Sequence, residues 1–350
     1  MAVPQSSRAD KRSNVGGTDK RSNALTGYKD KFISLPMTSL LQTLRALADP
    51  TRLRIIDLVR YMELAVGELA QVLGQSQPRV SRHLKILGDA GLIGRAKEGA
   101  WVFVRLGDAT HVGPVLGLLD TFGHRGDADR ARLATVRAER AAVAAAYFAV
   151  HAADWDGIRS LHVAEAEVEA AIVDLLGDRP VGRLLDIGTG TGRMVELLGA
   201  AAVSAIGVDR SPEMLRLARG RIEAAGLAHA EVRHADMYAL PRPDGSADTV
   251  VLHQVLHFAD APGAVIAEAA RVAGSGRVLV VDFAPHDREE FRLRHAHLRL
   301  GFDDAQVGGW LRAAGLEVVE SRHLCPSDAF PLTVSLWLGE RPPIAVRRAA

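Results

Sequence analysis

The sequence predicts two domains of different fold class: a mainly α winged helix-turn-helix, followed by an α/β Rossmann-like domain with a seven-stranded, mostly parallel sheet. Helical periodicity between residues 39 and 89 leads into an alternating segment around Glu98-Gly99, which is typical of a β-hairpin. Beyond residue 183, strand-like runs alternate with helical runs, an order that gives right-handed crossovers onto a parallel sheet. A chain of 350 residues is also long for one hydrophobic core.

The composition is that of an ordinary globular protein. Hydrophobic residues make up 48% and charged residues 24% of the chain. No apolar run reaches the ~18 residues of a membrane span, and the first residues lack the apolar core of a signal peptide. The single cysteine, Cys325, excludes an intramolecular disulfide and any metal site built from several thiolates. We therefore expect a cytoplasmic protein.

Composition and periodicity divide the chain into four parts. Residues 1–36 are polar and aperiodic, which predicts a disordered basic tail. Residues 37–107 form the predicted winged helix-turn-helix, residues 108–146 an Ala-rich helical connector, and residues 147–340 the α/β domain. The predicted strands of that domain are Arg183–Ile187, Ala205–Val208, Glu231–His234, Thr249–Leu252, Arg277–Asp282, Glu317–Arg322 and Thr333–Leu338. We expect the last two strands to form an antiparallel hairpin at one edge of the sheet.

A short helix predicted over Gln77–Leu87 has the two faces of a DNA-reading helix. At about 100° per residue, Val80, Leu84 and Leu87 share a buried face, and polar and basic residues share the other. Arginine pairs with guanine in the major groove, while lysine and serine hold phosphate. The candidate DNA-binding residues are Gln77, Arg79, Ser81, Arg82 and Lys85 in this helix and Arg95 and Lys97 beside the hairpin tip. The alternative is a solvated basic face on an ordinary helical bundle.

The segment around this helix is basic, and it resembles the ArsR/SmtB family of bacterial repressors. Ten basic and six acidic residues between Thr38 and Leu106 give it a net charge of +4. Residues 46–55 (ALADPTRLRI) look like the family's opening signature, residues 76–85 (SQPRVSRHLK) like its recognition helix, and residues 90–93 (AGLI) like its approach to the wing. The resemblance covers about residues 39–107. It implies a homodimer that binds a palindromic double-stranded DNA operator, with the helix after the wing in the dimer interface.

The chain departs from the metal-sensing members of that family. Those members carry paired cysteines in the segment that matches residues 63–69, where this chain has Ala65 and Gly67, which cannot ligate a metal. The second family site needs carboxylate and histidine ligands at a spacing that Asp108, His111 and His124 do not reproduce. We therefore predict a regulator without a metal site.

A glycine-rich loop follows the first predicted strand of the α/β domain. Asp186 precedes a Gly-x-Gly-x-Gly run over residues 188–192, where glycines let the backbone turn tightly and approach a ligand. The spacing differs from the Gly-x-Gly-x-x-Gly of dinucleotide folds, which disfavours a bound pyrophosphate. Asp209 ends the next strand and Asp236-Met237 follow the third, so carboxylates are available for ribose hydroxyls and an adenine amino group. The combination fits a cofactor with an adenosine end, a cationic sulfonium and no phosphate.

Residues 145–325 resemble the class I S-adenosylmethionine-dependent methyltransferases, most closely the ubiquinone/menaquinone-biosynthesis type. The resemblance implies S-adenosylmethionine as the cofactor. It implies that the amino-acid end is lined by Asp186, Gly188, Gly190 and Gly192, the ribose by Asp209, and the adenine by Asp236 and Met237. Tyr147 and Trp155 resemble an aromatic segment that folds over the cofactor in such enzymes. The alternative is that these aromatic side chains are ordinary core.

The predicted strand Thr249–Leu252 leads into the candidate catalytic residues. In the family this strand end faces the methyl group, and transfer to O, N or C needs proximity, exclusion of water and sometimes a base. His253 and His257 are the candidate bases; alternatively each caps a helix or lines the wall. No Asn-Pro-Pro-Tyr-like motif follows the strand, which argues against methylation of DNA bases. We therefore predict a small-molecule methyl acceptor.

The sequence leaves three functions open. The first is a transcriptional regulator fused to a working methyltransferase. The second is a repressor of methionine-cycle genes whose methyltransferase-like domain senses S-adenosylmethionine or S-adenosylhomocysteine without catalysis. The third is an enzyme whose winged helix serves only dimerisation. Arg79, Arg82 and Lys85 on the outward face count against the third, and His257 with the aromatic segment favours catalysis, so we predict the first.

Overall fold

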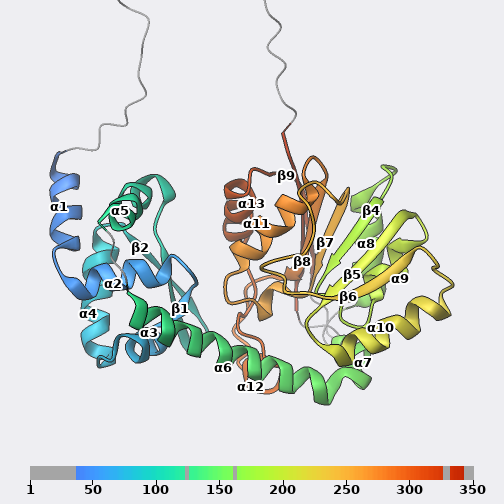
Figure 1. The fold of residues 1–350 in the computed structure, drawn as a ribbon, viewed down its shortest axis with the longest axis horizontal. Helices are drawn as coiled ribbons and strands as arrows, with labels where there is room; N and C mark the ends of the chain where they lie inside the picture. Colours follow the sequence, from blue (N-terminus) through green and yellow to red (C-terminus); the bar gives the residue numbers. More distant parts are fainter. Residues whose placement is uncertain (1–36, 123–125, 161–163, 326–331, 343–350) are drawn as a thin grey trace, which may run out of the picture.

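The computed structural model describes residues 37–122, 126–160, 164–325 and 332–342. These residues form two units that are joined by a long helix, α6 (Asp127–His151) (Figure 1). The predicted tail of residues 1–36 lies outside the described residues. In the described part of the chain, no helix is long and apolar enough to cross a membrane.

The first unit is a bundle of helices with a small sheet. Its elements are α1 (Met37–Leu47), α2 (Pro50–Val59), β1 (Leu64–Ala65), α3 (Val66–Leu73), α4 (Gln77–Asp89), β2 (Ile93–Glu98), β3 (Trp101–Leu106) and α5 (Ala109–Thr121). Asp49 caps α2 by accepting a hydrogen bond from the Arg52 amide (3.1 Å), and α3 ends at Gly74 in the left-handed conformation. β2 and β3 form an antiparallel hairpin, the wing. The predicted winged helix-turn-helix is confirmed; β1, which pairs with β3, is absent from the sequence prediction.

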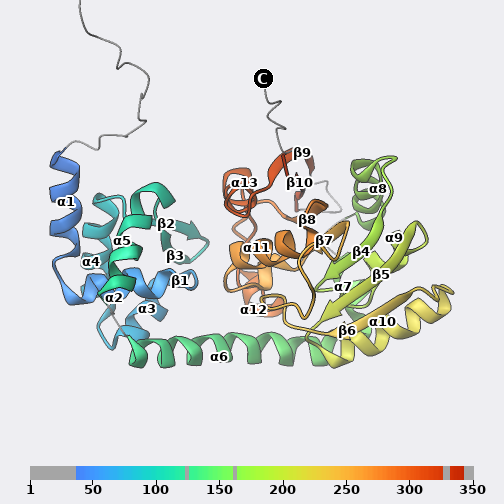
Figure 2. The ribbon, with the colours of Figure 1, turned by 45° about the horizontal axis from the view of Figure 1, so that its top comes forward.

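Helix α6 belongs structurally to the first unit before it reaches the second. Leu133 and Val136, in its first half, are buried in the hydrophobic core of the first unit. The Arg54 guanidinium donates to both carboxylate oxygens of Asp129 at 2.6 Å. Figure 2 shows α6 running along both units, with its second half beside the α/β unit. From Asp127 onward the predicted connector is therefore a continuous helix that packs against both units.

The second unit is a sheet covered by helices on both faces. Its elements are the single turn η1 (Ala152–Asp154), α7 (Trp155–Ser160), α8 (Glu165–Leu176), β4 (Gly182–Ile187), α9 (Arg193–Gly199), β5 (Ala202–Asp209), α10 (Pro212–Ala224), β6 (Ala230–His234), β7 (Thr249–His253), η2 (Leu256–Phe258), α11 (Pro262–Ala273), β8 (Arg277–Phe283), α12 (Glu290–His295), α13 (Asp304–Ala313), β9 (Glu317–Leu324) and β10 (Val334–Glu340).

The sheet has the strand order β6-β5-β4-β7-β8-β10-β9. The first five strands in this order are parallel, while β10 is antiparallel to both β8 and β9. The predicted seven-stranded, mostly parallel sheet with an antiparallel edge hairpin is confirmed. The order of the parallel strands reverses at β4 and β7, and in such sheets ligands bind at the carboxyl ends of the strands beside this point.

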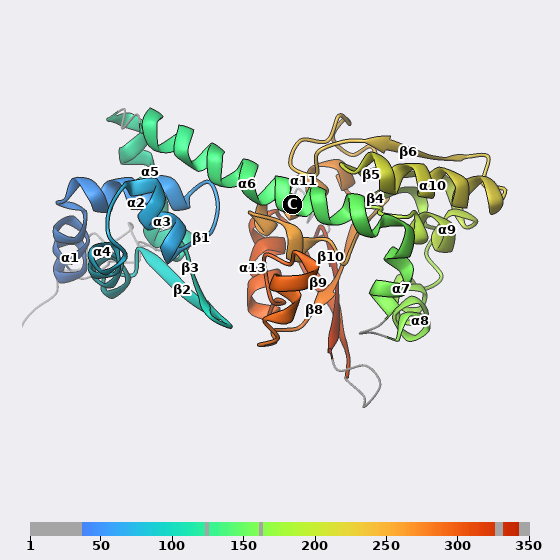
Figure 3. The same ribbon diagram turned by 90° about the horizontal axis from the view of Figure 1, so that it is seen from below.

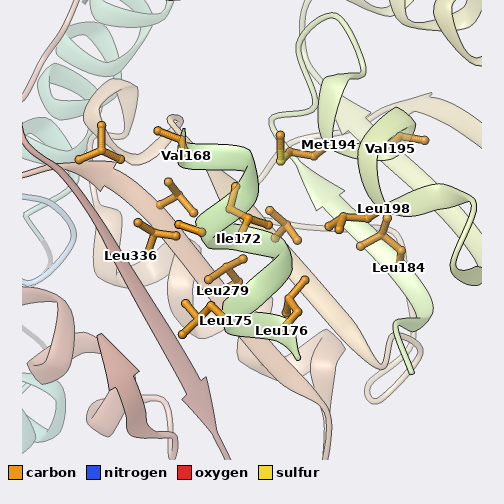
Figure 4. Close-up of a cluster of buried hydrophobic side chains, with 14 of the residues drawn as sticks. Val168, Ile172, Leu175, Leu176, Leu184, Met194, Val195, Leu198, Leu279 and Leu336 are labelled. Carbon is orange, nitrogen blue, oxygen red and sulfur yellow. The ribbon is translucent and has the colours of Figure 1, made fainter. Parts of the chain in front are cut away.

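Two apolar layers hold this unit together. On one face, Ile172 of α8 packs with Leu279 and Leu336 of the sheet, together with residues of α9 and α10 (Figure 4). On the other face, Val265 of α11 lies in the cluster that contains the buried indole of Trp337. Full burial of an aliphatic or aromatic side chain contributes about 1.5–3 kcal/mol, so the two layers fix the strand ends that carry polar residues.

We predict that Val136→Ala lowers the free energy of unfolding of the first unit by about 1–3 kcal/mol, because it leaves a cavity in a core that includes α6. Val143→Ala, one heptad later on the same helix and 62% exposed, is the matched control and should change stability by less than about 0.5 kcal/mol. Chemical denaturation measures both. Equal effects would mean that α6 does not belong to the core of the first unit.

Candidate cofactor site and DNA-facing surface

A cavity of about 340 Å³ lies at the carboxyl ends of β4, β5 and β7, beside the reversal of strand order. Residues of the glycine loop, of the three strand ends and of the segment 253–260 line it. The second half of α6 supplies a further wall. The cavity is thus built by residues that lie more than 100 positions apart in the chain.

The glycine loop approaches the cavity without side chains. Gly188 and Gly190 line the cavity with positive φ angles of 72° and 52°. A Cβ atom at Gly188 would lie 2.3 Å from Val255, so only glycine fits there. Asp186 also lines the cavity and is 1% exposed. Gly192 lies outside the lining, because it caps α9 and packs against Ala218.

Asp209 presents its carboxylate between the loop and the start of α10. It accepts hydrogen bonds from the amides of Gly190 (2.9 Å) and Ser211 (2.8 Å). Burial raises the pKa of Asp209, and the backbone donors partly oppose that rise. This half-buried carboxylate is an acceptor for the paired hydroxyls of a ribose.

On the adenine side, the structure separates two residues that the sequence groups together. Met237 lines the cavity. Asp236 lies outside the lining and is exposed, and its Oδ1 accepts a hydrogen bond from the Tyr238 amide at 3.0 Å. Tyr238 lines the cavity beside Met237, and burial raises its pKa to about 12.

The aromatic segment contributes one of its two predicted residues to the cavity. Trp155 lines it, together with Phe148 and Phe258; the ring centroids lie 5.3 Å (Phe148–Trp155) and 4.9 Å (Phe148–Phe258) apart. Tyr147 lies outside the lining and is hydrogen bonded through its hydroxyl to Nδ1 of His295 (2.9 Å). The three rings form an apolar wall that excludes water from this side of the cavity.

The two candidate catalytic histidines have different surroundings. His253, at the end of β7, lines the cavity and is 7% exposed. His257 lies behind the wall, 2% exposed, with its Nδ1 2.8 Å from Oδ1 of Asp282 and its ring stacked on His297 at 4.0 Å. Only His253 is therefore placed to touch a molecule in the cavity.

Gln254 is a site residue that the sequence does not reveal. Its φ of 51° is unusual for a residue with a side chain, and such strain costs about 1–3 kcal/mol and persists only where the surroundings impose it. The side chain lines the cavity, 7% exposed, and its buried Nε2 has no hydrogen-bond partner among the described residues. A buried donor of this kind needs an acceptor, and a ligand in the cavity supplies one.

Arg140 of α6 is a second such residue. It lines the cavity and donates to both carboxylate oxygens of Glu68 (2.9 and 2.6 Å) and to Asp260 (2.7 Å). Glu68 belongs to α3 of the first unit, whereas Asp260 precedes α11 of the second. A sequence pattern could not show this contact, because the three residues come from three separate segments.

These observations fit S-adenosylmethionine. The side-chain-free loop, the half-buried acceptor Asp209 and the orphaned donor of Gln254 match, in turn, close approach of the amino-acid end, two ribose hydroxyls and a carboxylate. No phosphate cradle with a Gly-x-Gly-x-x-Gly spacing is present in the sequence.

A separate surface carries the predicted DNA-binding residues. Val80, Leu84 and Leu87 of α4 are buried, and the opposite face is open. The exposed residues of that face are Gln77, Arg79, Ser81, Arg82 and Lys85, and Arg95 and Lys97 of β2 are exposed as well. Lys85 is paired with Asp89 at 3.0 Å, an exposed contact that phosphate can replace.

Fold and sites thus define a DNA-binding unit joined to an α/β unit with a nucleoside-type cavity, and comparison with known proteins agrees. The family of bacterial regulatory proteins of the arsR type matches residues 49–94, and a methyltransferase domain family matches residues 185–281. Demethylmenaquinone methyltransferase of Thermus thermophilus is 41% identical over 127 residues, which are 35% of this chain and 56% of the relative. Phosphatidylethanolamine N-methyltransferase of Cereibacter sphaeroides is 33% identical over 157 residues, 43% of this chain and 77% of the relative.

The first unit has its own relatives. The arsenical resistance operon repressor of Escherichia coli is 46% identical over 67 residues, 19% of this chain and 57% of the relative. The chain therefore belongs to the methyltransferase family and carries an ArsR-family domain in front of it, as the resemblances imply. The match also confirms the predicted cofactor, S-adenosylmethionine. The chain spans little more than half the length of the first and third of these relatives.

We predict that Gln254→Leu weakens S-adenosylhomocysteine binding by about 10- to 150-fold, the range for loss of a hydrogen bond to a charged group. Binding of 5′-methylthioadenosine, which lacks the amino-acid end, should stay within about twofold. Asp209→Ala is the comparison variant and should weaken both ligands, by about 1–3 kcal/mol. Isothermal titration calorimetry measures both affinities for the parent chain and for each variant. An equal loss of both ligands in Gln254→Leu would contradict a contact with the amino-acid end.

Proposed function

We propose that this chain is a DNA-binding transcriptional regulator of the non-metal-sensing ArsR type whose C-terminal domain is an S-adenosylmethionine-dependent methyltransferase for a small molecule. The observation that carries the proposal is the coexistence of an open basic face on α4 with a walled cavity at the strand ends. The cavity volume of about 340 Å³ suits small molecules and not a nucleic-acid strand. A cytoplasmic location and the four-part domain organisation belong to the same proposal.

In the enzyme half, the bound cofactor would supply an electrophilic methyl carbon on its sulfonium. Asp209 would hold the ribose hydroxyls and the Gln254 amide would hold the carboxylate, which would fix the reacting end. Trp155, Phe148 and Phe258 exclude water from the reacting atoms. His253 takes the proton of the acceptor's nucleophilic atom.

In this proposal His257 is a positioning residue. Its ring is fixed by Asp282 and by the stack on His297, and its carbonyl oxygen accepts from the amides of Leu298 (2.9 Å) and Arg299 (3.0 Å). These contacts hold the neighbouring Phe258 against the cavity.

In the DNA-binding half, a homodimer is supported by an apolar face that the described residues leave open. Large exposed apolar side chains lie on α1 and at the end of α5: Leu40, Leu41, Leu44, Leu118 and Phe122, which are between 48% and 82% exposed. Exposed apolar surface on neighbouring turns of a helix, as on α1, is a feature of protein–protein contacts. A second copy would cover it, as the ArsR-type helix after the wing implies.

The enzyme half is tested by label transfer. Incubation of the full chain with methyl-labelled S-adenosylmethionine and a protein-free metabolite extract should place label in a small molecule, and His253→Asn should slow this by about 10²-fold or more. His257→Asn should retain more activity. Label in DNA, or none with any extract, would overturn the enzymatic proposal. Binding of both cofactor forms without transfer would support the sensing alternative.

The DNA half is tested with a duplex enriched from a random library by the full chain. We expect Arg82→Ala/Lys85→Ala to abolish a gel shift and the parent's affinity to fall steeply with salt, because phosphate contacts release counterions. The matched control is Arg216→Ala/Arg219→Ala, exposed residues at the same spacing on α10. If the Arg82→Ala/Lys85→Ala variant bound the duplex with unchanged affinity, α4 would not be the DNA-reading helix.

A further inference from the structure

The tip of the wing is inserted into the α/β unit. Figure 3 shows β2 and β3 extending from the first unit toward the second. At the end of β2, Glu98 accepts hydrogen bonds from Nε of Arg299 (3.0 Å) and from Nη2 of Arg292 (3.2 Å). Both arginines belong to the second unit, in α12 and just after it. We call residues 289–300, which receive the tip, the wing socket.

The two arginines of the socket are almost fully removed from water. The Arg299 side chain is 1% exposed and Arg292 is 6% exposed. Arg299 also pairs with Glu63 of the first unit at 2.9 Å, and its guanidinium lies 4.4 Å from the centroid of the Phe103 ring of the wing. A buried guanidinium that loses its carboxylates is strongly destabilised, so withdrawal of the wing is unfavourable.

The backbone of the tip also contacts the wing socket. Gly99 has a φ of 57°, and a Cβ atom there would lie 1.8 Å from Oε1 of Glu289. The Ala100 amide donates to that same oxygen at 2.5 Å, and Arg292 donates to the Glu98 carbonyl at 2.9 Å. Glu98 thus contacts the α/β unit through its side chain, Gly99 through the close approach of its backbone, and Ala100 through its main-chain amide.

The DNA-facing residues stay open while the tip is docked. The five candidate residues of α4 are exposed in this arrangement, and so are Arg95 and Lys97 along β2. The docked tip therefore covers none of these candidate DNA-binding side chains. The tip itself offers Glu98, which would meet phosphate as a like charge.

We propose that the wing tip, Glu98-Gly99-Ala100, is a latch for the methyltransferase domain and stays in the wing socket when DNA is bound. DNA is then contacted by α4 and by Arg95 and Lys97 of β2, and the two domains keep their relative arrangement on DNA. This inference rests on the proposed DNA-binding function. The tip binds the second domain of its own chain. A wing tip without this partner would be free to contact DNA.

A reversible cross-link tests the latch. In a Cys325→Ser background, which removes the chain's only cysteine, Gly99→Cys places one thiol on the tip and Glu289→Cys places the other on the socket residue that faces it. The oxidised full chain should bind the selected duplex within about twofold of its reduced form. A loss of about tenfold or more on oxidation, restored by reductant, would overturn the latch, as would failure of the disulfide to form. Failure of the Cys325→Ser parent to bind DNA would instead overturn the proposed function.

An added cation at the tip gives an independent test. Ala100→Lys adds a positive charge to an exposed tip residue and keeps both the Glu98 carboxylate and the main-chain contact of residue 100. A latched tip predicts no gain in DNA affinity. A tip in contact with DNA predicts a gain in affinity and a steeper salt dependence, which would overturn the proposal. Gln77→Lys, the same added charge at an exposed position of α4, shows whether the assay registers an added cation.

Discussion

Arg140 is the point at which the two units constrain each other. Its guanidinium is 12% exposed and lies between carboxylates from α3 and from the segment before α11, so solvent and salt screen it poorly. Glu68, which receives two of its hydrogen bonds, also accepts from the Ala65 amide at the start of α3. A shift of α6 along its axis would break these contacts together. The wall of the cavity and the DNA-reading unit therefore share one helix, α6.

The cavity contains polar groups whose burial costs free energy and which a bound ligand would satisfy. The raised pKa of Asp209 and the orphaned amide of Gln254 both follow from the exclusion of water. The backbone of Gln254 persists at positive φ because its amide donates to Val281 of β8 at 2.7 Å, so the sheet imposes the conformation. Pre-formed strain and buried polar groups at one strand end are the features expected of a binding site and not of a core.

The wing has two parts with different partners. Its strands carry exposed basic residues, and its tip binds the second unit of the same chain. Its strands keep the exposed basic residues Arg95 and Lys97, whereas its tip carries an acid that matches two buried arginines of the second unit. The segment that follows the socket reaches the cavity wall, because the amides of Leu298 and Arg299 donate to the carbonyl of His257. The DNA-binding unit and the methyltransferase unit are thus joined at two separate places, α6 and the wing.

The sequence by itself determined both fold classes, the family resemblances and the positions of the strand-end acids, because periodicity, glycine spacing and helix caps act over a few neighbouring residues. Asp186, Asp209 and Gly190 could be named in this way. Tertiary structure alone decided that His253 and not His257 reaches the cavity, that Tyr147 and Asp236 lie outside its lining, and that Arg140 lines it. It also decided that Glu98 pairs with Arg299. These facts depend on side-chain direction and on contacts between segments up to 201 residues apart, which local patterns do not encode.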